Sequence, residues 1–200
     1  ELRDIVQSTL ESGDAEAITA MLEQLSGAEY AVVMGSQIDG NTAHLSYLRR
    51  MAGSGWELVG NSYTRAYVAM YTNDSNVNGD AHGRGYDRTE MGGQFALEFI
   101  GCKHMSSGIA VAAGRTRLQA DGALRVHSEN VYADAYTMYR SDNGYNALFS
   151  AGVGIHEHDL ARNVSGHRTK ANADGLSFNF MHESSVDMKI NETNKVQLFA

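Results

Sequence analysis

Proline is absent from this 200-residue sequence, and cysteine occurs once, at Cys102. A single cysteine excludes an intrachain disulfide and a cysteine-rich metal site. The longest wholly apolar run, residues 30–35, is much shorter than the ~20 residues that a transmembrane helix needs. These absences do not exclude a membrane, because a β-strand crosses a bilayer in about 9 to 11 residues with only every second one apolar.

Positive charge is also scarce. Lysine and arginine total 16 against 24 aspartates and glutamates, which gives a net charge of -8. Because phosphate binding needs a basic surface, nucleic acid is excluded as the main partner. The sequence is instead rich in glycine, with 21 residues, and in tyrosine, with 10. These residues, combined with short apolar alternation, favour a long antiparallel sheet.

The first 52 residues have helical periodicity and are predicted to form a helical linker and a pore helix. Apolar residues from Ile18 to Leu25 recur at helical spacing, after Ser12 or Asp14 as the N-cap. A second helix is predicted over residues 28–50. Its polar residues are spread around the axis, so it lacks the single apolar stripe of an ordinary surface helix. We expect it to lie against a polar face of the sheet.

From about residue 60 the apolar period changes to two, and residues 53–200 are predicted to form a β-domain. Seven strands are predicted, over residues 61–72, 86–100, 107–118, 130–140, 144–156, 174–182 and 186–199. Long connections alternate with tight turns, of which HESS at 182–185 is the last. An up-and-down meander of the outer-membrane barrel type produces this alternation, whereas a soluble sandwich with Greek-key crossings has no reason to produce it.

The two faces of these strands differ in character, as TEMGGQFALEF at 89–99 shows. In a soluble sandwich the apolar face would pack inward. In a membrane barrel it faces lipid, and the lipid-facing residues are predicted to be Phe95, Leu97, Phe99, Phe149, Val153 and Phe178. The predicted lumen-facing residues are Arg65, Glu90, Gln94, Glu98, Asp134 and Asn146. Small residues on the lumenal face are expected to leave room for the helix, at Gly92, Ala96, Gly152 and Gly154.

Several segments resemble, in order and spacing, the translocator domain of bacterial autotransporters. LEQLSGAEYAVVMGSQIDGNTAHLSYLRRM resembles the helix that threads the pore, and WELVGNSYTRAYVAMYTNDSNVNGDAHGRGYDRTEMGGQFALEF resembles the first hairpin of the barrel. GIAVAAGRTRLQADG, YADAYTMYR and GYNALFSAGVGIHEHDLARNVSG resemble the strands that follow. The similarity covers about residues 21 to 183 and rests on a distributed pattern, not on a catalytic signature.

This resemblance implies an all-β, up-and-down outer-membrane barrel with an N-terminal pore-threading helix, and export of an attached passenger as its function. It implies the passenger, the barrel-assembly machinery and lipopolysaccharide as partners, and neither a cofactor nor an enzymatic activity. Family barrels have about a dozen strands, an even number. With seven or eight strands here, we expect the C-terminal strands to be missing and this chain alone not to form a stable pore.

Five further positions have alternative interpretations. Arg115 and Arg117, near the long-loop end of their strand, are candidate contacts for lipopolysaccharide phosphates or simply a solvated strand end. His156 and His158 share a strand face, but a third metal ligand is lacking. Asn41 lies where some family members release the passenger by asparagine cyclisation, although the motif does not match closely.

Two other functions remain open from the sequence. One is a soluble β-rich surface adhesin or binding module. The other is an outer-membrane enzyme with a site in the long loops, at His156, Glu157, His158 and Asp159.

Overall fold

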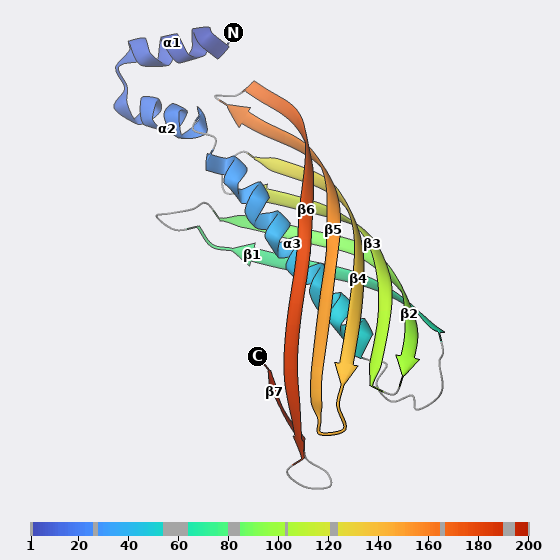
Figure 1. Cartoon of the computed structure of the whole chain (residues 1–200). Coiled ribbons are helices and arrows are strands. Elements are labelled where there is room, and N and C mark those ends of the chain that lie inside the picture. Colours follow the sequence, from blue (N-terminus) through green and yellow to red (C-terminus); the bar gives the residue numbers. More distant parts are fainter. Residues whose placement is uncertain are drawn as a thin grey trace.

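Three helices precede one antiparallel sheet in the computed structural model of the chain (Figure 1). The structure describes residues 2–25, 28–53, 64–79, 85–102, 104–120, 124–164, 167–189 and 195–199. The helices are α1 (Leu2–Ser12), α2 (Ala15–Leu25) and α3 (Ala28–Gly53). The strands are β1 (Thr64–Val77), β2 (Tyr86–Cys102), β3 (Met105–Ala120), β4 (Arg125–Arg140), β5 (Tyr145–Val164), β6 (His167–Lys189) and β7 (Lys195–Phe199).

The break between α1 and α2 is set by local chemistry. Gly13 adopts a φ of 66°, which glycine reaches without steric cost and which ends α1. Asp14 then caps α2, because its Oδ1 accepts hydrogen bonds from the backbone N–H groups of Glu16 and Ala17 at 3.0 and 3.1 Å. The predicted N-cap is confirmed. Helix α1 lies within the predicted helical linker, but its bounds were not predicted from the sequence.

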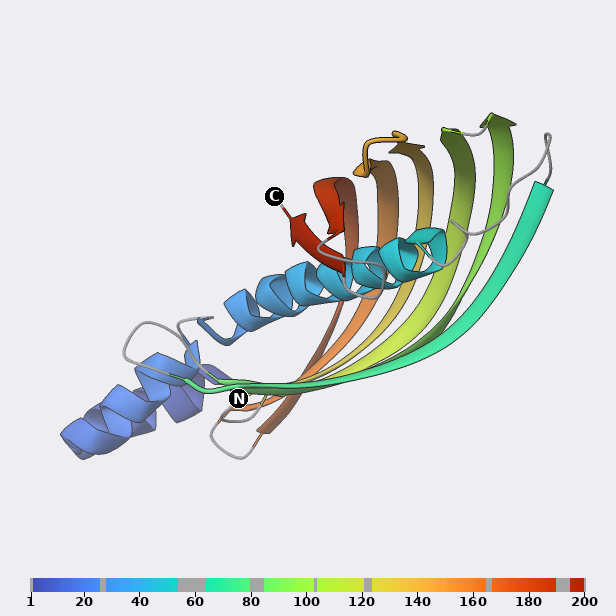
Figure 2. The same cartoon turned by 90° about the horizontal axis from the view of Figure 1, so that it is seen from below.

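Helix α3 lies lengthwise along the concave side of the curved sheet, as Figure 2 shows. Its buried residues recur every fourth position, at Val32, Ser36, Gly40, His44 and Leu48. A spacing of four drifts by about 40° per step around a helix of 3.6 residues per turn. The buried line therefore winds around α3, because the twisted sheet curves around the helix and does not cover a straight stripe.

The seven strands pair in sequence order, β1 to β7, each antiparallel to the next. The connection expected to be long between residues 156 and 174 is instead mostly strand: β5 continues to Val164 and β6 begins at His167. The seventh predicted strand is also wrong in its bounds. Residues 182–185 form no turn but pair with residues 146–149 of β5, so residues 186–189 belong to β6.

Two small apolar clusters hold the ends of α3. One surrounds Leu48 near the tight turns and contains Ala96, Ala110, Tyr136, Met138 and Leu148. The other surrounds Val32 at the opposite end and contains Tyr86, Leu118, Ala120, Leu124, Val126 and Leu160. Between these clusters, most side chains that face the helix are polar. The interior is therefore apolar where the helix enters and leaves, and polar along most of its length.

Candidate functional site

The convex face of the sheet carries an apolar band. One row, set by strand register, crosses six strands and contains Val68, Phe95, Val111, Ala133, Val153 and Phe178. The rows on either side are Ala66, Leu97, Ile109, Ala135, Ala151, Phe180 and Met70, Gly93, Ala113, Val131, Ile155, Leu176. Val68 and Phe178 are each 79% exposed, so this face has no protein cover among the described residues.

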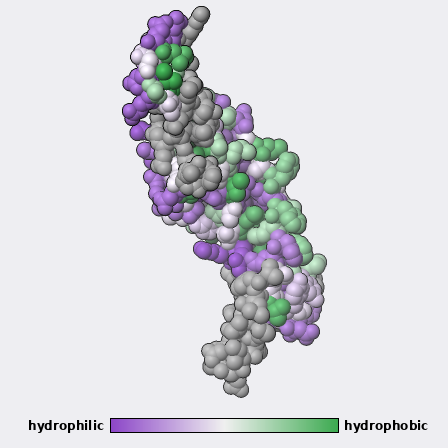
Figure 3. Space-filling model, turned by 90° about the vertical axis from the view of Figure 1, so that its left-hand side faces the viewer, coloured by the Kyte–Doolittle hydropathy of each residue, from purple (hydrophilic) through white to green (hydrophobic). Residues whose placement is uncertain are grey.

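The band ends in polar rows. Toward the extended strand ends the next row contains Thr72, Met91, Arg115, Glu129, Glu157 and Asp174, and toward the tight turns it contains Thr64, Phe99, Ser107, Thr137, Phe149 and His182. Figure 3 shows hydrophobic residues gathered over the middle of one side of the molecule, with hydrophilic ones beyond them. All six residues predicted to face lipid lie on this convex face, five exposed and Leu97 half-buried.

The predicted lumen-facing residues share the concave face. Glu90, Gln94, Glu98 and Asp134 are buried beneath α3, with no more than 4% of each residue exposed. Arg65 and Asn146 lie at the margin of this face and are half-buried. Arg65 donates a hydrogen bond to the Tyr67 hydroxyl at 2.9 Å, and the Asn146 amide donates to the Gly144 carbonyl at 3.2 Å. This polar face and α3 together form the candidate site.

His44 connects α3 to the wall at mid-length. Its Nε2 donates to Oδ2 of Asp134 on β4 at 2.5 Å, and both side chains are fully buried. The imidazole also stacks on Tyr132, with ring centroids 4.4 Å apart and planes 10° apart. Near the tight-turn end, Arg49 pairs with Glu183 of β6 at 2.7 Å in a more exposed position. A buried hydrogen bond to a carboxylate depends on distance and direction, so it fixes the position of the helix more strictly than apolar contact does.

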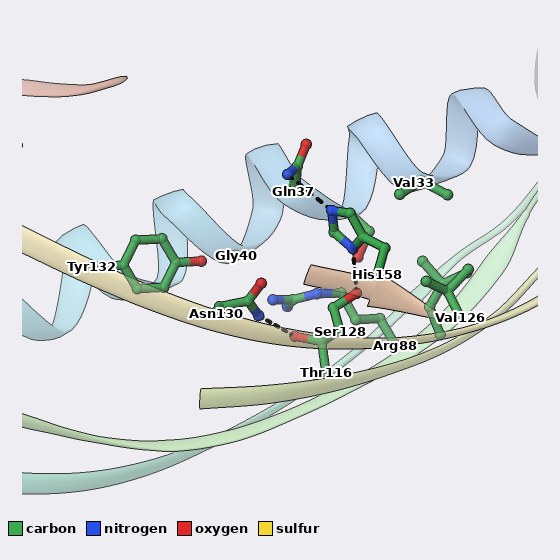
Figure 4. A pocket seen from close by; sticks show the side chains of 12 residues that line it. Val33, Gln37, Gly40, Arg88, Thr116, Val126, Ser128, Asn130, Tyr132 and His158 are labelled. Atoms are coloured by element: carbon green, nitrogen blue, oxygen red, sulfur yellow. Dashed lines mark hydrogen bonds between the residues drawn. The ribbon is translucent and has the colours of Figure 1, made fainter. Parts of the chain in front are cut away.

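Two histidines of β5, His156 and His158, make hydrogen bonds near α3, and Figure 4 shows those of His158. Gln37 of α3 donates to Nε2 of His158 at 3.1 Å, and the other ring nitrogen contacts Ser128 at 2.6 Å. His156 contacts Asn130 and Ser177, both at 2.9 Å. All four ring nitrogens are therefore occupied by neutral groups, and the described residues hold no cluster of three metal-ligating side chains. His158 therefore contributes to helix docking, whereas His156 connects β5 to its neighbouring strands β4 and β6.

A buried ion pair lies under the middle of α3. Arg88 and Glu90 of β2 contact each other through Nη2 and Oε2, and both side chains are 1% exposed. A Cβ atom on Gly40 would lie 2.9 Å from Nη2 of Arg88 and 3.3 Å from the Tyr132 hydroxyl. Glycine at this position lets the helix backbone approach the ion pair closely.

Glycines on the concave face accommodate aromatic rings from neighbouring strands. Tyr71 lies opposite Gly92, Tyr136 opposite Gly108 and Tyr132 opposite Gly154. A Cβ atom on Gly92 would lie 2.7 Å from the Tyr71 hydroxyl. The expectation that Gly92, Gly152 and Gly154 leave room for the helix is therefore wrong, since two of them hold tyrosine rings and Gly152 holds the Asp134 carboxylate.

This packing predicts a face-dependent response to the smallest substitution. At Gly108 a Cβ atom would lie 2.5 Å from Tyr136 Cζ and 2.6 Å from the Leu97 carbonyl oxygen. Gly108→Ala is expected to lower the free energy of unfolding by about 1–3 kcal/mol, because the ring and backbone must move. Gly93→Ala is the control, since its Cβ would meet only the Ala69 carbonyl at 3.6 Å on the convex face. Urea unfolding of the complete barrel in detergent measures both, and equal midpoints would contradict this packing.

Asn41 lies in α3 and is half-buried, with no hydrogen-bond partner for its Oδ1 among the described residues. Sequence reasoning missed His44, Arg88, Tyr132 and Gln37. Strand alternation already places Arg88 beside Glu90 and Tyr132 beside Asp134 on one face, but it does not show which of them meet the helix.

The chain was compared with known proteins. The model of the autotransporter β-domain family matches residues 66–200. The chain belongs to this family. Its fold is similar to the translocator domain of the autotransporter NalP from Neisseria meningitidis, with a TM-score of 0.60, 12% identity, and 75% of this chain and 54% of that one covered. It is also similar to the β-domain of the Bordetella autotransporter BrkA, with a TM-score of 0.59, 13% identity, and 67% and 53% covered.

Membership of the autotransporter β-domain family makes the chain a bacterial outer-membrane protein, and its sheet part of a translocator barrel. The family also implies an attached passenger domain. The chain spans about half the length of the two translocator structures it matches. A search of curated protein sequences found no significant match. Among the described residues, no helix is both long and apolar enough to cross a membrane.

Proposed function

We propose that this autotransporter sheet forms one side of an outer-membrane barrel whose polar lumen lets the attached passenger cross, and that α3 occupies the lumen in the state described. One observation carries the proposal: α3 lies lengthwise on the polar, concave face of a sheet whose opposite face is apolar. A soluble module would bury its phenylalanines, but Phe95 and Phe178 here are 40% and 79% exposed.

The polar wall suits a passing polypeptide. An unfolded chain keeps its backbone N–H and C=O groups hydrated or hydrogen-bonded, because each unsatisfied group in an apolar medium costs several kcal/mol. Carboxylates, amides and hydroxyls on the concave face, among them Glu90, Gln94 and Ser150, offer such partners. The proposed role needs no catalytic group, since passage through a hydrated lumen makes and breaks no covalent bond.

The direction of α3 agrees with export. Its first residues lie at the end where β5 and β6 extend far past the apolar band, and α1 and α2 continue beyond that end (Figure 1). Extended strands and long connections lie outside the cell in outer-membrane barrels, and tight turns lie in the periplasm. We infer that the segment before α3 emerges on the cell surface, where an exported passenger is found.

Two partners follow from the sheet itself. Strand β1 has 14 residues and pairs with β2 alone among the described strands. An exposed edge of this length must be covered in a membrane, either by further strands of the protein or, during insertion, by the barrel-assembly machinery. Lipid covers the apolar band, and lipopolysaccharide is the proposed contact for the basic residues above it, among them Arg117.

A charge placed in the apolar band tests the membrane assignment. Val111→Arg, in the central apolar row, is expected to destabilise the barrel by about 2–4 kcal/mol, as a cation does at the bilayer midplane. Gln119→Arg is the matched control on the same strand and face, beyond the apolar rows. Two quantities are measured in the full-length protein: the fraction of heat-modifiable barrel, and the amount of passenger that protease can reach on intact cells. Both should fall for Val111→Arg and stay unchanged for Gln119→Arg. If both variants behave like the wild type, the sheet does not face lipid and a soluble binding module becomes the better interpretation.

A further inference from the structure

Four basic residues gather on the convex face, beyond the apolar band and toward the extended strand ends. Arg115 and Arg117 lie on β3, and Arg125 and His127 lie on β4. All four side chains are exposed. The register places Arg117 directly beside His127, and Arg125 beside Gln119. The chain has a net charge of -8, so a basic group of this density is a local feature that needs its own explanation.

The four residues are not equivalent. Nε of Arg115 donates to Oε1 of Glu129 at 3.0 Å, so its charge is already matched on the protein. Arg117 and Arg125, by contrast, make no ion pair and no side-chain hydrogen bond with any described residue. Of the two residues predicted to contact phosphate, Arg117 remains a candidate and Arg115 does not. The two basic residues of β4, Arg125 and His127, join Arg117.

The spacing suits one compact anion. Directly opposite residues on adjacent strands have Cβ atoms ~5 Å apart, and diagonal neighbours such as Arg117 and Arg125 are ~7–8 Å apart. Long arginine side chains from such positions reach the same phosphate, and the planar guanidinium binds phosphate oxygens in pairs. On the β5 side, Asp159 lies beside His127 and Glu157 lies beside Glu129. These carboxylates lie at the edge of the basic group, and their negative charge would repel a long polyanion that extended past it.

The depth of the group in the membrane fits a lipid headgroup. Ala113 and Val131 belong to the last wholly apolar row, and Arg117 and Arg125 follow four and six residues farther out along β3 and β4. At about 3.3 Å per residue and a tilt of 35–45°, these residues lie roughly 10–15 Å above the apolar band. The headgroup region is about 5–7.5 Å deep on each side of the bilayer. The backbone at these positions therefore lies just outside it, and the long arginine side chains extend back to phosphates at its surface.

We propose that Arg117, Arg125 and His127 bind a phosphate group of the phosphorylated glycolipid of the outer leaflet, that is, lipopolysaccharide. The site rests on the proposed function, because it requires the extended strand ends to lie on the outer side of the membrane. Bound lipid would anchor β3 and β4 to the leaflet at a fixed height. It would also hold the rim of the barrel steady beside the mouth through which the passenger leaves.

The test uses the full-length protein purified from outer membranes in detergent, with bis-phosphorylated lipid A as the probe. The double variant Arg117→Gln/Arg125→Gln is expected to lower lipid A affinity at least tenfold in native mass spectrometry. The matched control, Arg168→Gln/Lys170→Gln, removes the same charge from exposed positions on β6 and should bind like the wild type, as should Arg115→Gln. Equal loss in the two double variants would show a nonspecific charge effect and overturn the site.

Two further arms identify the ligand and separate this proposal from the proposed function. Dephosphorylated lipid A should bind the wild type as weakly as bis-phosphorylated lipid A binds the double variant. Inorganic phosphate that binds as tightly as lipid A would show a free-anion site and overturn the lipid assignment. Heat-modifiability and passenger exposure should be unchanged in every variant. If the wild-type protein does not fractionate with the outer membrane, the proposed function is contradicted. If the wild type inserts but Arg117→Gln/Arg125→Gln binds lipid A as tightly as the wild type, only the phosphate site is contradicted.

Discussion

Deleting residues 1–53 from the β-domain of the full-length protein is expected to raise its single-channel conductance in planar bilayers several-fold. An α-helix with its side chains is about 10–12 Å across, which is a large part of the lumen of a barrel with about a dozen strands. In the structure, α3 follows the concave wall over residues 28–53, and its buried line touches that wall at both ends and at mid-length. Removing it leaves a continuous polar path.

A shorter deletion provides the control. Removing residues 1–25 takes away α1 and α2, which lie at the end of the sheet where β5 and β6 are extended, and leaves α3 in place (Figure 1). This variant should conduct like the wild type. The plug interpretation would be contradicted if the longer deletion left conductance unchanged, or if the shorter deletion opened the pore equally.

Much of this architecture could be predicted from local pattern. Period-two alternation placed Phe95 and Glu90 on opposite faces. The register aligns Phe95 with apolar residues on five other strands and Glu90 with polar residues on four. Alternation is a local property that the pleat of a strand enforces, so it survives any uncertainty about neighbours. The long polar helix was predictable for the same reason, since residues 28–50 have helical composition without an apolar stripe.

Strand lengths were harder to predict. Residues 182–185 and 165–175 are polar and resemble turn sequences, yet most of them lie in β6. Beyond the apolar band a barrel strand meets water on its outer face, so its composition no longer differs from that of a loop. What keeps residues 167–175 extended is the hydrogen-bonded ladder with β5, which runs without interruption from Val164↔His167 to Tyr145↔Val186. That ladder depends on a partner strand and is not visible in either strand alone.

The contacts that dock α3 depend on long-range geometry. His44 and Asp134 lie 90 positions apart in the chain, and Gln37 and His158 lie 121 apart. The sequence shows that Asp134 is on the concave face, but the angle of the helix and the curvature of the sheet decide which helical residue reaches it. The same holds for Arg115, because the register between β3 and β4 decides that Glu129 lies opposite it.

The His44–Asp134 contact makes the second large prediction. The Asp134 carboxylate is fully buried, and its Oδ2 is held by Nε2 of His44. His44→Phe keeps an aromatic ring stacked on Tyr132 but removes the only donor on α3 that reaches this carboxylate among the described residues. Removing one member of a buried pair typically costs about 3–5 kcal/mol, because the other charge stays buried without compensation. We expect that cost to fall on helix docking, since the strand ladders are untouched.

Conductance measures this cost directly. The high-conductance level of the 1–53 deletion defines the undocked state, and His44→Phe should increase the ratio of undocked to docked time by at least roughly 100-fold. Asp134→Asn keeps a hydrogen-bond acceptor of the same shape and should have a much smaller effect. The double variant His44→Phe/Asp134→Leu leaves no uncompensated charge at this position, so it should return most of the way toward the closed level. A His44→Phe protein that stays closed, or a double variant as open as the single one, would show that this pair does not hold the helix in the lumen.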